Sequence, residues 1–255
     1  MPQPNIVILD TPEAVHVRAA EEIAHWAGDA VCTHGEFTLC LAGGSTPAPA
    51  YELLATRFRL SIDWRDVQFF WGDERCVGPG DPASNFAMAR RTMLEPLSIK
   101  PAQIHRIHGE EQPDAAAAAY EDELRRAFSL EPGPVPVFDL MLLGLGQNAH
   151  IASLFPSSPA LREERRLAVA VDVDDRLAHR ITVTPPVINR AAHVILMVCG
   201  EGKALAVHDV LEGPRDPGRL PAQIVAPSEG DVLWLLDRAA ASGLRSSAAT
   251  GGSDG

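Results

Sequence analysis

His150 is the histidine whose surroundings best suit proton transfer. It lies in the segment GLGQNAHIASLFP, residues 144–156, directly after an apolar run. A strand that leads into a helix here would place the imidazole in the first helical turn, where the helix dipole lowers its pKa and favours the neutral base. The sequence therefore predicts a general base, with a structural histidine as the alternative.

Two further segments could hold an anion. One is LAGGSTP, residues 41–47, whose backbone can approach a ligand closely and whose hydroxyls lie beside the free N–H groups of a helix start. Its candidate residues are Gly43, Gly44, Ser45 and Thr46. The other is GEGKA, residues 200–204, in which Lys203 offers a positive charge near a helix start. A capped helix and a surface lysine are the respective alternatives.

A third polar segment, WGDERC, covers residues 71–76 and also follows a buried apolar run. Ligands of open α/β sheets bind at the carboxyl ends of the strands, so Asp73 and Arg75 are well placed to contact a substrate. A solvated loop with an internal Arg–Asp pair is the alternative.

The elements that would position these residues are short apolar runs alternating with alanine-rich helical stretches. The predicted strands are 5–10, 37–44, 67–74, 138–146, 180–185 and 193–200. The predicted helices are 12–33, 47–57, 84–94, 114–128 and 203–212. Near-continuous apolar runs are typical of strands buried on both faces of a sheet. The alternation predicts an α/β fold with helices covering a mostly parallel sheet.

Composition favours a single globular unit. The 255 residues are 46% hydrophobic and 22% charged, which is enough apolar chain to bury a core. We expect one domain over residues 3–243. The small, polar residues 246–255 are expected to be disordered.

The charge balance limits the partners of the chain. Its formal net charge of −12 disfavours nucleic acid and anionic membranes, so an anionic substrate would need a locally positive pocket. Without an apolar run of about 18 residues or a signal-peptide pattern, we expect a cytoplasmic protein. Four widely spaced cysteines predict reduced core thiols rather than a disulfide or zinc site. A monomer and a small homo-oligomer both remain open.

Together and in this order, the segments resemble the 6-phosphogluconolactonase family, within the wider superfamily of glucosamine-6-phosphate isomerases and deaminases. The resemblance also rests on Ser84-Asn85, on Arg180, Thr182, Thr184 and Asn189, and on the segment 221–227. It spans about residues 5 to 240. It implies a Rossmann-like α/β sandwich and hydrolysis of 6-phospho-D-glucono-1,5-lactone to 6-phosphogluconate, in the oxidative pentose phosphate pathway, with no cofactor or metal.

The sequence departs from the family's pattern in the residues beside His150. Where the family carries Asp-Gly-His-Thr, this chain carries Asn148-Ala149-His150-Ile151. Asn148 can form hydrogen bonds but cannot stabilise an imidazolium as a carboxylate does. If residue 149 needs a positive φ, the methyl group of Ala149 adds strain.

The resemblance implies His150 as the base that removes a proton from the water attacking C1. Asp73 would contact sugar hydroxyls or this water. The groups expected to bind the phosphate and the sugar are Gly43, Gly44, Ser45, Thr46, Arg75, Arg180 and Lys203.

Two other functions stay open from the sequence. An amino-sugar-phosphate isomerase/deaminase would be similar in the Asn-x-His segment, but those enzymes carry a glutamate where Phe155 stands. A non-catalytic sugar-phosphate binder would account for the changed Asn148-Ala149 pair.

Overall fold

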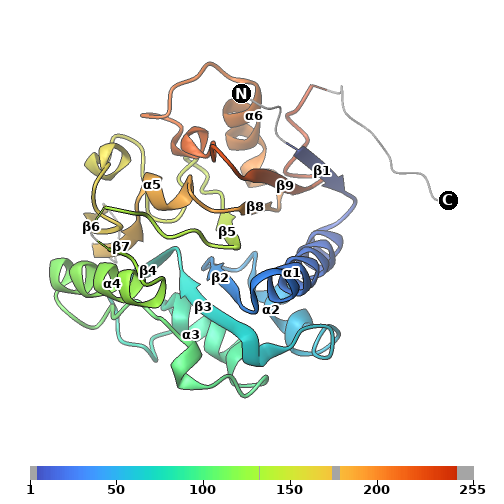
Figure 1. Cartoon of the computed structure of the whole chain (residues 1–255). Helices are drawn as coiled ribbons and strands as arrows, with labels where there is room; N and C mark the ends of the chain where they lie inside the picture. Colours follow the sequence, from blue (N-terminus) through green and yellow to red (C-terminus); the bar gives the residue numbers. More distant parts are fainter. Residues whose placement is uncertain (1–4, 132, 174–178, 246–255) are drawn as a thin grey trace.

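The centre of the molecule is a six-stranded sheet in which every neighbouring pair is parallel. The computed structural model describes residues 5–131, 133–173 and 179–245. The strand order β1-β9-β8-β5-β2-β3 is seen in Figure 1. The strands are β1 (Asn5–Leu9), β2 (Phe37–Leu41), β3 (Val67–Trp71), β5 (Leu140–Gly144), β8 (His193–Val198) and β9 (Asp231–Asp237). All five residues of β2 are buried, as expected for a strand covered on both faces.

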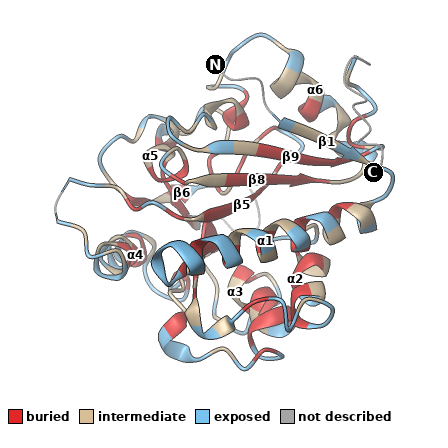
Figure 2. Cartoon of the chain, turned by 45° about the vertical axis from the view of Figure 1, so that its right-hand side comes forward, coloured by how far each residue is buried: buried red, intermediate tan, exposed pale blue. Residues whose placement is uncertain are grey.

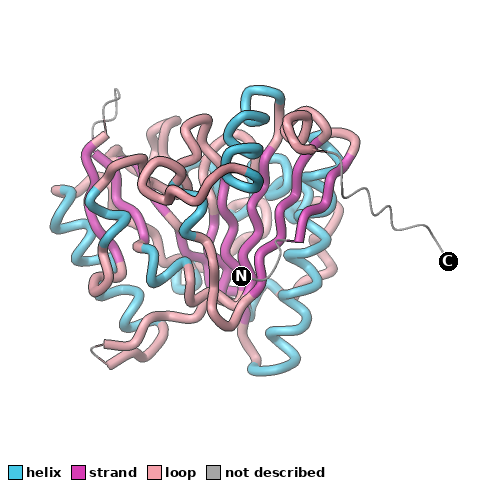
Figure 3. The backbone as a smooth tube through the Cα atoms, turned by 90° about the horizontal axis from the view of Figure 1, so that it is seen from above, coloured by secondary structure: helices cyan, strands magenta, loops and turns pink. Residues whose placement is uncertain are grey.

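Helices lie on both sides of these strands (Figure 3). They are α1 (Pro12–His34), α2 (Ala48–Ala55), α3 (Asn85–Ala89), α4 (Pro113–Ala127), α5 (Pro185–Ile188) and α6 (Ala204–Glu212). A π-helical turn follows α3 at Arg90–Leu94. Short 3-10 turns lie at Trp64–Asp66, Pro101–Gln103, Pro159–Arg162, Glu201–Lys203 and Pro221–Ile224. The predicted α/β class, a Rossmann-like parallel sheet with helices on both faces, is confirmed.

The longest helix, α1, shows why the predicted helices form. Thr11 caps it by accepting a hydrogen bond from the backbone N–H of Ala14, and Gly35 ends it at a φ of +85°. Buried residues such as Val15, Ala19 and Ile23 recur at helical spacing and face the sheet, while the outer face is exposed (Figure 2).

A second, antiparallel sheet corrects part of the strand prediction. It consists of β4 (Asp73–Arg75), β7 (His179–Val183) and β6 (Ala168–Asp172), in the order β4-β7-β6. The predicted strand 180–185 therefore lies outside the parallel sheet. The chain passes from the parallel sheet to the second sheet at Gly72. The N–H of Gly72 donates a hydrogen bond to the carbonyl of Leu41 in β2, and its carbonyl accepts one from the N–H of Val183 in β7. The predicted strand 67–74 proves to be two strands, β3 and β4. The sequence prediction did not include β6 and β9, although Val232–Leu236 of β9 is as apolar as the predicted runs.

One contiguous cluster of buried side chains includes residues of both sheets and of the helices. The single domain over residues 3–243 stays a prediction that this cluster supports. The predicted disordered tail, residues 246–255, lies outside the described residues. Within the described ranges, none of the helices has the length and apolar character needed to cross a bilayer. Of the predicted core thiols, Cys40 is buried, but Cys32 is exposed because it lies on the outer face of α1.

Candidate functional site

The predicted site segments meet at the carboxyl ends of β2, β3, β5 and β8 (Figure 1). Three hydrogen bonds tie them together. Lys203 Nζ donates to the carbonyl of Leu145 at 2.6 Å, and Ser153 Oγ donates to Asp73 Oδ2 at 2.6 Å. Asn85 Nδ2 donates to Asp73 Oδ1 at 3.0 Å. Parallel strands thus bring residues from distant parts of the sequence to one edge of the sheet.

His150 is held as a neutral base with a defined tautomer. Its Nδ1 lies 2.6 Å from Asn148 Oδ1, which also accepts the backbone N–H of His150 at 3.3 Å. An amide oxygen can only accept, so Nδ1 carries the proton and Nε2 keeps its lone pair. The ring also contacts Phe155, with centroids 4.5 Å apart.

Burial lowers the pKa of His150 to about 4, and the positive charges of Arg180, Lys203 and Arg75 lower it further against the opposing effect of Asp73. The direction agrees with the sequence prediction, but the predicted cause is wrong. Residues 147–155 form turns and an isolated bridge rather than a helix, so the predicted helix, whose dipole would act on the ring, does not form. Desolvation keeps the imidazole uncharged instead.

The loop that carries His150 is strained. Ala149, Ala152 and Ser157 have φ angles of +62°, +46° and +63°, in the left-handed region that non-glycine residues rarely adopt. The carbonyl of the buried Ala149 accepts a hydrogen bond from Ala222, which helps to hold this conformation. Gly146 is required for another reason: a Cβ there would lie 2.0 Å from His150 Nδ1.

The neighbouring carboxylates have different roles. Asp73 is buried, and each of its carboxylate oxygens accepts a hydrogen bond from a different segment of the chain. Glu74 faces away and accepts hydrogen bonds from Ser84 and from the backbone N–H groups of Arg75, Asn85 and Phe86. Burial raises the pKa of Glu74. Glu74 therefore fixes the start of α3, and Asp73 is the carboxylate whose charge acts on His150.

Arg75 and Arg180 stand directly opposite each other on β4 and β7. Arg75 donates to the carbonyl of Ala83, and its buried Nε has no hydrogen-bond partner among the described residues. The guanidinium of Arg180 lies over the Phe155 ring, 5.6 Å from its centroid. Residues directly opposite each other on neighbouring strands have side chains on the same face of the sheet, and guanidinium groups are strong hydrogen-bond donors to anions.

The Gly43–Thr46 turn lies against Asn85, whose side chain donates a hydrogen bond to Asp73. Gly44 has a φ of +94°, and a Cβ at Gly43 would lie 1.9 Å from Asn85 Oδ1, so neither position readily accepts another residue. In the part of the chain that the structure describes, no side chain caps α2, whose N-cap position is Pro47, so the hydroxyls of Ser45 and Thr46 are not used for capping. Burial lowers the pKa of Lys203, which lies in the 3-10 turn before α6.

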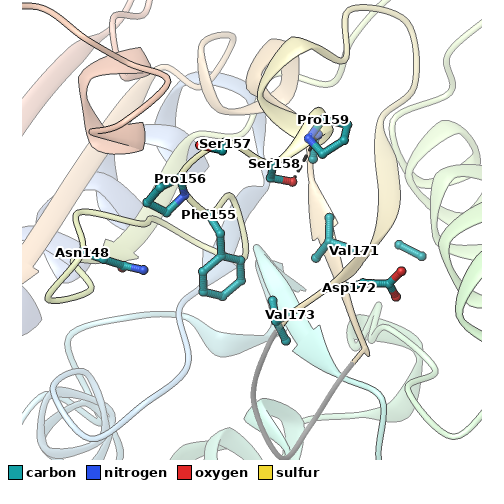
Figure 4. A pocket seen from close by; sticks show the side chains of 11 residues that line it. Asn148, Phe155, Pro156, Ser157, Ser158, Pro159, Val171, Asp172 and Val173 are labelled. Carbon is teal, nitrogen blue, oxygen red and sulfur yellow. Dashed lines mark hydrogen bonds between the residues drawn. The ribbon is translucent and has the colours of Figure 1, made fainter.

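A cavity of about 610 Å³ opens beside the loop that carries His150 (Figure 4). Asn148 and Phe155 line one side, and Val171 and Asp172 of the β6 edge line the other. Its polar groups include Ser157 and Ser158. Across the described ranges, no group of three or more His, Cys, Asp or Glu side chains could hold a metal ion.

Sequence reasoning missed two residues of this arrangement, Ser153 and Asn85. Both belong to segments that carried the resemblance, but only the folded chain shows that their side chains meet at Asp73.

Comparison with known proteins identifies the family of this chain. Residues 10–234 match the family described as glucosamine-6-phosphate isomerases/6-phosphogluconolactonase. The chain is 38% identical over 243 residues to the 6-phosphogluconolactonase of Synechocystis sp., which covers 95% of this chain and 99% of the relative. It is 39% identical over 249 residues to that of Mycobacterium tuberculosis, again covering 95% and 99%.

Solved structures agree. The 6-phosphogluconolactonase from Trypanosoma brucei superposes with a TM-score of 0.84 at 29% identity, covering 95% of this chain and 99% of the other. A monomeric glucosamine-6-phosphate deaminase superposes with a TM-score of 0.79 at 23% identity, covering 94% and 100%, and at that identity the likeness shows the fold alone. By sequence and structure, this chain belongs to the glucosamine-6-phosphate isomerase/6-phosphogluconolactonase family.

Proposed function

We propose that this enzyme hydrolyses 6-phospho-D-glucono-1,5-lactone to 6-phospho-D-gluconate, the second step of the oxidative pentose phosphate pathway, with His150 as the general base. The observation that carries the proposal is the neutral imidazole of His150. Because Nδ1 donates its proton in a hydrogen bond to Asn148 Oδ1, the Nε2 lone pair can accept a proton. The substrate assignment is supported by relatives named 6-phosphogluconolactonase that match nearly the whole chain.

In the proposed reaction, His150 Nε2 takes a proton from a water molecule whose oxygen attacks C1 of the lactone. The carbonyl electrons move to the carbonyl oxygen and form a tetrahedral oxyanion. When the intermediate collapses, the bond from C1 to the ring oxygen breaks, and the imidazolium returns its proton to that oxygen. Asp73 supplies a negative charge that stabilises the imidazolium, since Asn148 is neutral.

The positive groups bind the substrate in this proposal. The Gly43–Thr46 turn and Lys203 hold the phosphate through N–H, hydroxyl and ammonium donors. Arg75 and Arg180 add positive charge and further donors for the phosphate and the sugar hydroxyls. Binding of a phosphate remote from C1 orients the lactone for attack. The protein is acidic as a whole, but its site is locally basic.

No specific observation favours the amino-sugar-phosphate isomerase/deaminase or the non-catalytic binder. Phe155, which stands where deaminases carry a glutamate, packs on the His150 ring and offers no group for proton transfer. A binding protein without activity would not need a histidine with a fixed tautomer and a free Nε2.

A direct assay tests the proposal. Decay of the phosphorylated lactone is measured with and without protein, by following 6-phosphogluconate with a coupled dehydrogenase. We expect hydrolysis well above the spontaneous rate and no release of ammonia from glucosamine 6-phosphate. Ammonia release would support the deaminase instead, and binding of 6-phosphogluconate without turnover would support the binder.

A further inference from the structure

We infer that Ser153 is a positioning residue, which holds the Asp73 carboxylate in the orientation that stabilises the protonated His150. This inference rests on the proposed function, because it concerns the charge that supports the general base. Ser153 follows His150 by three residues on the same loop, and its side chain is 0% exposed. It would act through Asp73 without touching the substrate.

The position of Ser153 is fixed from two directions. Its hydroxyl donates to Asp73 Oδ2 at 2.6 Å, and its backbone N–H donates to Thr182 Oγ1 at 3.2 Å. Thr182 is the cross-strand partner of Asp73 in the β4–β7 pair. The loop is therefore attached at Ser153 to the two strands that carry Asp73 and Arg180.

The other carboxylate oxygen of Asp73 is bound from the opposite side. Asn85 Nδ2 donates to Asp73 Oδ1 at 3.0 Å and to the Asp73 carbonyl at 2.8 Å. Asn85 is buried and lies so close to Gly43 that a Cβ at that position would overlap its side chain. With both oxygens bound, rotation of the carboxylate would break a hydrogen bond to a charged group, which is among the stronger kinds.

The orientation of Asp73 matters because of the charges around His150. Among the described residues, the charged side chains that act most on the ring are Asp73, Arg180, Lys203 and Arg75, and of these four Asp73 is the anion. A carboxylate at position 148 would have supplied a second negative charge, but Asn148 supplies only orientation. Within the described part of the chain, Asp73 is thus the carboxylate that stabilises the imidazolium, and Ser153 holds one of its oxygens.

A double-mutant cycle tests this coupling. Ser153→Ala, Asp73→Asn and the double variant are compared with the wild type for kcat and KM on the phosphorylated lactone. We expect Ser153→Ala to lower kcat by about tenfold or more with little change in KM, since misplacement of a group that supports the transition state affects the chemical step. On the Asp73→Asn background, the same change should lower kcat by less than about twofold, because no charge remains to be positioned.

A second readout does not depend on turnover. NMR titration of the His150 ring reports its pKa, which the negative charge of Asp73 raises. Asp73→Asn should therefore lower the pKa of His150. Ser153→Ala should lower it in the wild-type background and leave it unchanged in the Asp73→Asn background.

Thr38→Val provides the matched control. The buried Thr38 Oγ1 donates to Asp139 Oδ2 at 2.7 Å, so the variant also removes a hydroxyl-to-carboxylate bond, at the amino end of β2 and away from the site. It should change neither kcat nor the pKa of His150. If Ser153→Ala does not fold, Ser153→Cys takes its place in the cycle. Cysteine fills the site, but its S–H group is a weaker hydrogen-bond donor than the serine hydroxyl.

Additive effects in the cycle, or an unchanged His150 pKa in the Ser153 variant, would overturn the inference. So would a loss of kcat in Thr38→Val equal to that in the Ser153 variant. A wild type that does not hydrolyse the lactone overturns the proposed function, and the titration then still decides whether Ser153 positions Asp73.

Discussion

Asn148 Oδ1 lies 2.6 Å from Nδ1 of His150, the residue that we propose as the general base. The amide fixes the ring and its tautomer as a carboxylate would, but it adds no charge. In the proposed mechanism, Asn148 orients the ring and Asp73 supplies the stabilising charge, two roles that one acid beside the histidine could provide together.

The pH dependence of the wild type follows from the burial of His150. Because its pKa is lowered to about 4, the base stays unprotonated until the pH falls through that range. We expect the acidic limb of kcat/KM to lie near pH 4 rather than near the ordinary histidine value. A limb near pH 6.5 would show that the ring is solvated in the active enzyme.

Restoring the acid beside the histidine should change this profile. In Asn148→Asp the negative charge favours the imidazolium and raises the pKa of His150, so the acidic limb of kcat/KM moves to higher pH and the plateau rises. Ala149→Gly relieves about 1 kcal/mol of strain at the positive φ of residue 149. The double variant should exceed either single variant in kcat/KM. If its limb and plateau match the wild type, residue 148 does not support the histidine.

Lys203 should contribute mainly to binding of the phosphate. Lys203→Ala is expected to raise KM for the phosphorylated lactone by an amount equivalent to about 1.5–3 kcal/mol, as for a hydrogen bond to a charged group. Because Lys203 also donates to the carbonyl of Leu145, we expect a smaller fall in kcat. Lys100→Ala, which removes an exposed lysine, is the control. An unchanged KM in Lys203→Ala would contradict the assignment.

The opposed arginines should make the fold respond to anions. Binding of 6-phosphogluconate at about 100 times its Kd should stabilise the wild type by about 2.7 kcal/mol, seen as a rise in Tm. In Arg180→Gln the same ligand concentration should give a clearly smaller rise. Arg18→Gln, on the exposed face of α1, should respond like the wild type. Equal rises in all three proteins would exclude Arg180 from the anion site.

The sequence predicted the parts of the fold that depend on local pattern. Runs such as Phe37–Leu41 and Leu140–Gly144 are apolar throughout, which is the pattern of a strand buried on both faces. The hydrophobic pattern could not show that His179–Val183 belongs to a second sheet. Its partner β4 follows β3 directly, and the two strands are separated only at Gly72, where the chain leaves the parallel sheet.

The candidate site was predicted at the level of segments rather than contacts. His150, Asp73 and Lys203 were named because chemically useful residues followed strands. The helix expected at His150 does not form, since tertiary hydrogen bonds such as that from Ala222 to Ala149 hold the loop in left-handed turns. The sequence gives no sign of the contacts that Ser153 and Asn85 make with Asp73, because the role of a serine or an amide depends on the carboxylate that it contacts in the folded chain.

The most direct test of His150 as general base is the kcat of His150→Gln, corrected for spontaneous lactone hydrolysis. Glutamine keeps the polarity of the side chain without its basicity, so kcat should fall by about 10²–10⁴-fold while 6-phosphogluconate still binds. His108→Gln, which changes an exposed histidine, should retain full activity. A fully active His150→Gln enzyme would contradict the mechanism and leave the proton of the attacking water to another base.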